Sequence, residues 1–312
     1  MPLLKVEDLK VYYPIRSGFF RTVKDYVRAV NGISFAIKEG ETYGLVGESG
    51  CGKTTTGRTI IGLNKATSGH VYLQDGEQQV DLLNLKRSEF RKYRSDLQMI
   101  FQDPYSSLNP KKRVKDIILE PLRNFEHLTP NEEEERIVEA LEKVGLGRDS
   151  MYKYPHQFSG GQRQRIGIAR SLVISPRLII ADEPVSALDV SVQAQVLNFM
   201  KEIQKEFNLS YLFISHDLGI IRHMCDRIGI MYNGRLVEEG TTEDIFNNPQ
   251  HLYTKRLLSA IPNIDPQKRL ENKKFRDRIE EDFKKNFRTF FDENGRIYDL
   301  KPISETHSVA IP

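Results

Sequence analysis

Gly47-Glu48-Ser49-Gly50-Cys51-Gly52-Lys53-Thr54-Thr55 is the stretch that decides how the rest of this chain is interpreted. A short run of strand type, residues 42–46, comes before it, and residues 55–61 continue with helical character. Small residues between a strand and a helix let successive backbone N–H groups face an anion, and the helix N-terminus adds partial positive charge. The stretch therefore predicts a loop that holds phosphate groups, called the phosphate loop below.

Two side chains of the phosphate loop add chemistry to its backbone. Lys53 would supply a formal charge to the outer phosphates, and Thr54 offers a hydroxyl oxygen of the kind that Mg²⁺ accepts. The alternative is an ordinary glycine-rich turn that carries a surface lysine. The motif predicts nucleotide contacts from Gly47, Ser49, Gly50, Cys51, Gly52, Lys53, Thr54 and Thr55.

The composition is that of a globular protein with balanced charge. The chain has 312 residues, of which 39% are hydrophobic, and its 46 basic and 43 acidic side chains leave a net charge of +3. This balance gives no argument for a nucleic-acid partner. Cys51 and Cys225 are too few for a disulfide scaffold or a four-cysteine metal site, so a reducing compartment is expected. No apolar run approaches the about 18 residues of a membrane-spanning helix, so another chain would have to supply any membrane anchor.

Hydrophobic patterning predicts an α/β protein. Strand patterns precede the phosphate loop, with a loop expected after Pro14, and the stretch from residue 116 to residue 145 is helical. Apolar strands at residues 178–181 and 211–214, separated by an amphipathic helix at residues 192–207, indicate a mostly parallel sheet. After Pro249 the alternation ends. One or two helices with a solvated charged face are expected there, with apolar residues at Leu270, Phe275, Ile279, Phe283 and Phe287.

Asp182 and Glu183 follow an apolar strand and would lie at the edge of the sheet. In phosphate-loop enzymes the first of two such carboxylates holds Mg²⁺, and a carboxylate beside it can polarise the attacking water. The alternative is a solvated strand end. We assign Asp182 to the metal and Glu183 to the water.

The signature loop, Phe158-Ser159-Gly160-Gly161-Gln162, leads directly into a helix. Small residues at a helix N-terminus form a second surface that can face an anion. Alone, this pattern would equally fit a glycine turn capped by Ser159.

Five motifs in a fixed order make the chain similar to the ATP-binding subunit of an ABC transporter over residues 3–250. They are the phosphate loop, Gln102, the signature loop, Asp182-Glu183 and His216. The resemblance implies a phosphate-loop ATPase fold over residues 1–250. It further implies an antiparallel β subdomain, a helical subdomain inserted at about residues 103–170, and a C-terminal extension over residues 251–312.

The resemblance also implies roles for individual residues. Such subunits dimerise head to tail, so that Ser159, Gly160, Gly161 and Gln162 contact ATP on the partner's phosphate loop. His216 would hold the γ-phosphate and the attacking water, and Gln102 would reach the Mg²⁺ site and sit where the membrane subunit docks. Ser186-Ala187-Leu188-Asp189 resembles the loop that crosses the dimer interface, which gives Asp189 a contact with ATP.

Two smaller points accompany the motifs. Tyr13 is similar in position to the aromatic residue that stacks on adenine, with Tyr12 as the competitor for that role. Phe158 stands where the family usually has leucine, which leaves the rest of the signature loop intact.

Residues 14–20, 101–110 and 248–258 resemble the oligopeptide and dipeptide permease ATPases, and most closely the second, F-type ATPase of an oligopeptide importer. The implied partners are a different ATPase chain, two transmembrane permease subunits and, indirectly, an external peptide-binding protein. The implied place is the cytoplasmic face of the plasma membrane. No iron–sulfur cluster is expected, because the chain has no cysteine after Cys225.

The sequence gives less support to two other functions. A soluble ABC-type ATPase acting on DNA or ribosomes usually has two ATPase units or a long coiled-coil insertion, and this chain has one phosphate loop. A GTPase would need an aspartate two residues after the Asn64-Lys65 pair, and Thr67 stands there.

Overall fold

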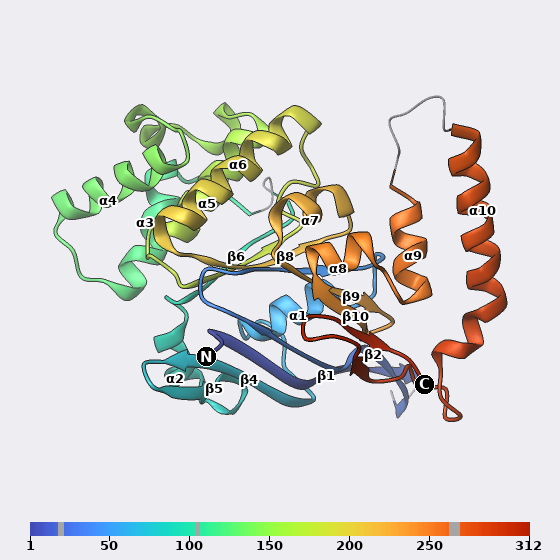
Figure 1. The fold of residues 1–312 in the computed structure, drawn as a ribbon. Coiled ribbons are helices and arrows are strands. Elements are labelled where there is room, and N and C mark those ends of the chain that lie inside the picture. Colours follow the sequence, from blue (N-terminus) through green and yellow to red (C-terminus); the bar gives the residue numbers. More distant parts are fainter. Residues whose placement is uncertain (18–21, 104–106, 262–268) are drawn as a thin grey trace. The chain divides into compact units, whose positions relative to one another are not determined.

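The computed structural model describes residues 1–17, 22–103, 107–261 and 269–312, with the side chains of residues 269–272 left out (Figure 1). The chain divides into two compact units. The first unit comprises residues 1–37, 42–84 and 213–312, and the second comprises residues 38–41 and 85–212. In the part of the chain that the structure describes, every helix is too short or too polar to span a lipid bilayer.

The first unit contains an antiparallel sheet with the strand order β2-β1-β4-β5. Alternate residues of β1 are buried because one face of the sheet covers the core. The strands are β1 (Leu4–Ser17), β2 (Thr22–Ile37), β4 (Ser68–Asp75) and β5 (Gln78–Asp81).

The prediction of a loop after Pro14 is wrong, because β1 continues to Ser17 and pairs there with Thr22 of β2. Beyond Lys10, which is paired with Ser68, β1 has no further pair with β4. Proline is tolerated there because its fixed φ suits an extended chain on a strand paired on one side. Residues 18–20 of the expected insertion lie outside the described residues.

A second group of strands in the first unit has the order β11-β12-β10-β9-β3. Strands β3 and β9 are parallel, whereas the other neighbouring pairs are antiparallel. The strands are β3 (Thr42–Val46), β9 (Arg227–Tyr232), β10 (Arg235–Thr241), β11 (Leu300–Pro302) and β12 (Ser308–Ala310). The last two were not expected from the sequence, since three-residue strands are too short to show an alternating pattern.

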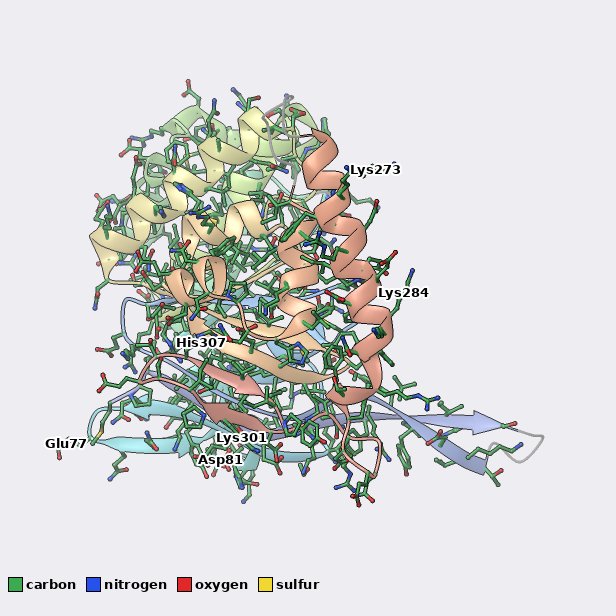
Figure 2. All side chains as sticks on the ribbon, turned by 45° about the vertical axis from the view of Figure 1, so that its right-hand side comes forward. Glu77, Asp81, Lys273, Lys284, Lys301 and His307 are labelled. Carbon is green, nitrogen blue, oxygen red and sulfur yellow. The ribbon has the colours of Figure 1, made fainter. Side chains whose placement is uncertain are left out.

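Five helices described in the first unit are α1 (Lys53–Ile60), α7 (Leu218–Met224), α8 (Thr242–Asn247), α9 (Leu252–Ser259) and α10 (Arg269–Asn286). Helices α9 and α10 lie side by side (Figure 1). Of the apolar residues noted there, Ile279 and Phe283 of α10 are buried, whereas Phe275 is 56% exposed. The side chain of Leu270 lies outside the described residues. The charged side of α10 is solvated, and Lys273 and Lys284 point outward from it (Figure 2).

The second unit contains the parallel pair β6 (Leu97–Ile100) and β7 (Leu178–Asp182). Its helices are α2 (Arg87–Tyr93), α3 (Val114–Phe125), α4 (Pro130–Lys143), α5 (Gly160–Leu172) and α6 (Val190–Phe207). Strand β8 (Ser210–Ser215) carries the chain from this unit into the first. The core side of α6 is buried through Ile203, but Phe207 is 42% exposed, with the Lys143 ammonium 4.2 Å from its ring centroid.

Candidate active site

The phosphate loop lies between the buried strand β3 and the start of α1, as predicted. Gly52 directly precedes α1 with φ of 110°, and a Cβ atom there would lie 2.1 Å from the carbonyl oxygen of Ala29. A Cβ atom on Gly47 would lie 2.1 Å from the carbonyl oxygen of Met231. Both positions therefore require glycine, because neighbouring backbone approaches too closely for any side chain. By contrast, a Cβ atom on Gly50 would meet nothing within 4 Å.

Lys53 is held inside this loop and is only 5% exposed. Its ammonium donates to the carbonyl oxygens of Gly47 at 2.6 Å and Glu48 at 2.9 Å. The charge is thus held within the loop whose backbone N–H groups would face a phosphate. Thr54 and Thr55 follow in the first turn of α1 and are partly exposed.

Cys51 is buried beside Lys53, with 3.7 Å between its Sγ atom and the lysine Nζ atom. Burial raises the pKa of the thiol, and the neighbouring lysine charge opposes this shift without cancelling it. The thiol is therefore neutral at physiological pH. The backbone N–H group of Cys51 donates to the Glu48 carbonyl oxygen at 3.3 Å, so Cys51 contributes to the loop by closing a turn within it.

Tyr12 and Tyr13 differ clearly in their surroundings. The Tyr12 hydroxyl donates to Asn31 Oδ1 at 2.6 Å, and the guanidinium of Arg28 lies 5.9 Å from the centroid of its ring. Tyr13 is 43% exposed on β1. Only the ring of Tyr13 is thus largely accessible to a planar ligand.

His216 lies directly after β8 and is exposed. The next residue, Asp217, caps α7, since its Oδ1 atom accepts the N–H groups of Gly219 at 2.8 Å and Ile220 at 3.2 Å. The histidine is therefore placed at a junction that is fixed by a strand on one side and a capped helix on the other.

In the second unit, Asp182 ends β7 and is 1% exposed. Glu183 follows with φ of 48°, a left-handed conformation that costs a non-glycine residue about 1–2 kcal/mol. Its Oε2 atom accepts a hydrogen bond of 2.8 Å from Nε2 of Gln102. Strained residues of this kind cluster at functional sites.

The structure thus brings two predicted site residues, Gln102 and Glu183, into direct contact. Sequence reasoning did not pair them. The signal that could have done so is the parallel pairing of β6 and β7, because the carboxyl ends of parallel neighbours meet at the same edge of a sheet.

The signature loop forms the N-terminus of α5, as predicted. Ser159 and Gln162 form a reciprocal capping box, in which Ser159 Oγ accepts the Gln162 N–H group at 3.3 Å and Gln162 Oε1 accepts the Ser159 N–H group at 3.0 Å. A Cβ atom on Gly161 would lie 2.2 Å from Cγ1 of Val192, so this glycine allows α5 and α6 to approach closely. Gly160 is the first residue of α5, and Asp189 is exposed immediately before α6.

Tyr13, the phosphate loop and His216 belong to the first unit, whereas Gln102, the signature loop, Asp182, Glu183 and Asp189 belong to the second. Sequence reasoning missed the contacts of the phosphate loop with the C-terminal part of the chain. The N–H group of Glu48 donates to the hydroxyl of Tyr253 at 3.0 Å, across 205 positions of the chain. No local pattern signals a contact between residues so far apart.

Two family models match the chain. Residues 30–186 match the family described as ABC transporter, and residues 237–289 match the family described as oligopeptide/dipeptide transporter, C-terminal region.

Several curated proteins are similar to the chain over most of its length. The oligopeptide transport ATP-binding protein OppF of Lactococcus lactis is 57% identical over 310 residues, which cover 99% of this chain and 96% of the relative. The oligopeptide transport ATP-binding protein AppF of Bacillus subtilis is 53% identical, with 83% of this chain and 78% of the relative covered. The dipeptide transport ATP-binding protein DppF of Escherichia coli is 48% identical, with 86% and 79% covered.

Solved structures share the fold. The protein cbiO1 of Clostridium perfringens, part of an ABC transporter complex, has a TM-score of 0.68 at 28% identity and covers 82% of this chain and 95% of that protein. A dimeric ATP-binding cassette in a post-hydrolysis state, bound to ADP and Pi, has a TM-score of 0.66 at 27% identity, with 77% of this chain and 98% of that protein covered.

Proposed function

This chain belongs to the ABC-transporter family of ATP-binding proteins, and on that premise we propose that its ATP hydrolysis energises the import of oligopeptides or dipeptides across the plasma membrane. Peptides are proposed as the substrate because the similarity to peptide-transport ATPases continues through the C-terminal region. This region has its own family match at residues 237–289. The ATP-binding cassette alone would support many substrates.

The residues of each unit suit the binding of ATP with Mg²⁺. Lys53 and the glycines of the phosphate loop would hold the phosphates, since the lysine charge is held within the loop and the loop offers backbone N–H donors. Thr54, Gln102 and Asp182 offer a hydroxyl, an amide oxygen and a carboxylate, which are the hard oxygen ligands that Mg²⁺ prefers. Mg²⁺, when bound, neutralises charge on the β- and γ-phosphates.

Glu183 is proposed as the base that accepts a proton from the attacking water, and His216 as the group that orients this water and the γ-phosphate. The contact between Gln102 and Glu183 supports a link between the base and the place near Gln102 where a membrane subunit would dock. Movement of one of these two side chains would alter the position of the other.

The proposed domain boundaries remain residues 1–250 for the ATPase and residues 251–312 for the extension.

The proposed assembly is a head-to-tail heterodimer with a second ATPase chain, beneath two transmembrane permease subunits, on the cytoplasmic face of the plasma membrane. An external peptide-binding protein would act indirectly, through the membrane subunits. Ser159, Gly160, Gly161, Gln162 and Asp189 would complete the partner's site. The exposure of Ser159, Gln162 and Asp189 at two helix N-termini supports this, although Gly161 is buried.

The second unit also holds a polar cavity of about 420 Å³ beside β6, whose lining includes Gln98, Lys112, Glu120 and Arg170. Gln98 of this lining lies in β6, and Gln102 follows two residues after the end of that strand. We propose that this region docks a membrane subunit, because Gln98 of its lining and Gln102 are joined by the end of the same strand.

The test of this proposal is purification of the full chain from membranes, with identification of the chains that accompany it. We expect another ATPase chain and two polytopic membrane subunits, and ATPase activity stimulated by a peptide-loaded binding protein. ATPase stimulation by DNA or ribosomes, without membrane partners, would instead support the soluble ATPase.

A second experiment addresses adenine stacking. Stacking of a base on an aromatic side chain contributes about 1–3 kcal/mol, so Tyr13→Ala should raise the Kd for ATP roughly tenfold in a fluorescence titration. The matched change Tyr12→Ala should lower the melting temperature, because it removes the hydrogen bond to Asn31, and leave the Kd nearly unchanged. The reverse pattern would assign the role to Tyr12.

A further inference from the structure

The phosphate loop is hydrogen-bonded to the C-terminal part of the chain. Tyr253 lies in α9 and is fully buried, and its hydroxyl oxygen accepts the N–H group of Glu48 at 3.0 Å. Glu48 is the second residue of the loop. One backbone donor of the loop is therefore engaged by a side chain of the region matched to peptide transporters.

A second contact joins the same two segments. Nη1 of Arg256, one turn after Tyr253, lies 3.1 Å from Oε1 of Glu48. The Nε atom of the same arginine donates to Glu280 of α10 at 2.7 Å, and its guanidinium lies 4.6 Å from the ring centroid of Phe283. Arg256 is thus held by α10 while it contacts the loop.

The backbone N–H group and the backbone carbonyl group of Glu48 are both hydrogen-bonded. Tyr253 accepts from its N–H group, and the Lys53 ammonium donates to its carbonyl oxygen at 2.9 Å. A shift of Tyr253 would therefore move the residue to which the phosphate-binding lysine is bonded. The path from α9 to Lys53 passes through a single residue.

The tyrosine is well placed to hold the loop. Its ring centroid lies 4.5 Å from that of Tyr232 and 6.3 Å from that of Phe283. Tyr232 follows Met231, whose carbonyl oxygen closely approaches Gly47. Burial raises the pKa of the Tyr253 hydroxyl, so the group remains neutral throughout the physiological range.

We propose that the pair of helices α9 and α10 sets the conformation of the phosphate loop, with Tyr253 and Arg256 as positioning residues for ATP binding. The proposal rests on the function proposed above, since it assumes that this loop binds ATP. It gives the C-terminal region a direct effect on nucleotide affinity. A purely structural role would instead affect folding stability alone.

The test uses Tyr253→Phe in the full chain, because this change removes the hydroxyl and keeps the ring. We expect the Kd for a fluorescent ATP analogue, titrated with Mg²⁺ present, to rise roughly three- to tenfold, as for the loss of one ordinary hydrogen bond. In the assembled transporter, the KM for ATP should rise while kcat is retained, because the contact acts on binding rather than on the chemical step.

Arg256→Gln tests the second contact and should raise the Kd about two- to threefold, since this ion pair is partly exposed and weaker. Glu48→Gln should have a similar effect, and the double variant should show less than the sum of the two effects, because both changes break the same contact. The control is Tyr211→Phe, which removes the hydroxyl of another buried tyrosine, one that donates to the Met200 carbonyl oxygen at 3.3 Å. Its Kd should equal that of the unaltered chain.

Unaltered Kd and KM in Tyr253→Phe and Arg256→Gln, in proteins that remain folded by circular dichroism, would overturn the inference and leave the proposed function intact. Failure of the unaltered chain to bind the ATP analogue would overturn the proposed function itself. Equal weakening in Tyr211→Phe would show that loss of any buried hydroxyl has the effect, and would also overturn the inference.

Discussion

Glu183→Gln is expected to reduce ATP hydrolysis by at least about 100-fold and to leave ATP binding unchanged. General base catalysis contributes typically about 10²–10⁴-fold to a rate, and an amide cannot accept the proton. A 100-fold loss corresponds to about 2.7 kcal/mol in the activation barrier.

The structure explains why this substitution should alter proton acceptance without disturbing the local structure. The side-chain carbonyl oxygen of glutamine can still accept the hydrogen bond that Gln102 donates to Glu183 at 2.8 Å. Glutamine has the same length as glutamate, and the left-handed backbone at this position costs both residues a similar amount. The substitution therefore changes the proton-accepting group and little else.

The measurement is a comparison of single-turnover hydrolysis with the Kd for ATP, in the full chain assembled with its partners. Glu206→Gln serves as the control, because it makes the same chemical change on the exposed part of α6. We also expect ATP-dependent dimers to accumulate in Glu183→Gln. Unchanged turnover would remove Glu183 from the role of base.

The parts of the fold that the sequence predicted well are those set by local physics. The position of the phosphate loop is predicted correctly, because glycine, lysine and threonine at this spacing between a strand and a helix are typical of a loop that binds phosphate. The helical character of residues 116–145 is confirmed by α3 and α4. The start of α4 is fixed locally by the capping box of Thr129 and Glu132, in which the Thr129 N–H group donates to Glu132 Oε2 at 2.7 Å.

The parts that were missed depend on contacts between distant segments. Strand β12 exists because residues 308 and 309 pair with β10, and three residues carry no pattern of their own. The sequence predicts a loop after Pro14, whereas pairing with β2 continues β1 through Ser17. The contacts of Gln102 with Glu183 and of Tyr253 with Glu48 join residues 81 and 205 positions apart, which only the folded chain brings together.

Lys53→Ala is expected to raise the Kd for ATP by at least about 100-fold. Lys53 is the buried cation of the phosphate loop, and hydrogen bonds that involve a charged group contribute about 1.5–3 kcal/mol each. Two such bonds to the phosphates would account for a loss of that size or more.

The same substitution should also lower stability when ATP is absent. The Lys53 ammonium donates to the carbonyl oxygens of Gly47 and Glu48, and alanine leaves both without this donor. A cost of about 1–3 kcal/mol is expected, seen as a lower melting temperature. Lys65→Ala, on an exposed lysine of the same unit, should change neither quantity. If Lys53→Ala lowered the melting temperature but retained the Kd for ATP, the lysine would be a structural clamp of the loop. Because its two hydrogen-bond acceptors belong to the loop itself, a joint loss of stability and affinity is the result that the geometry supports.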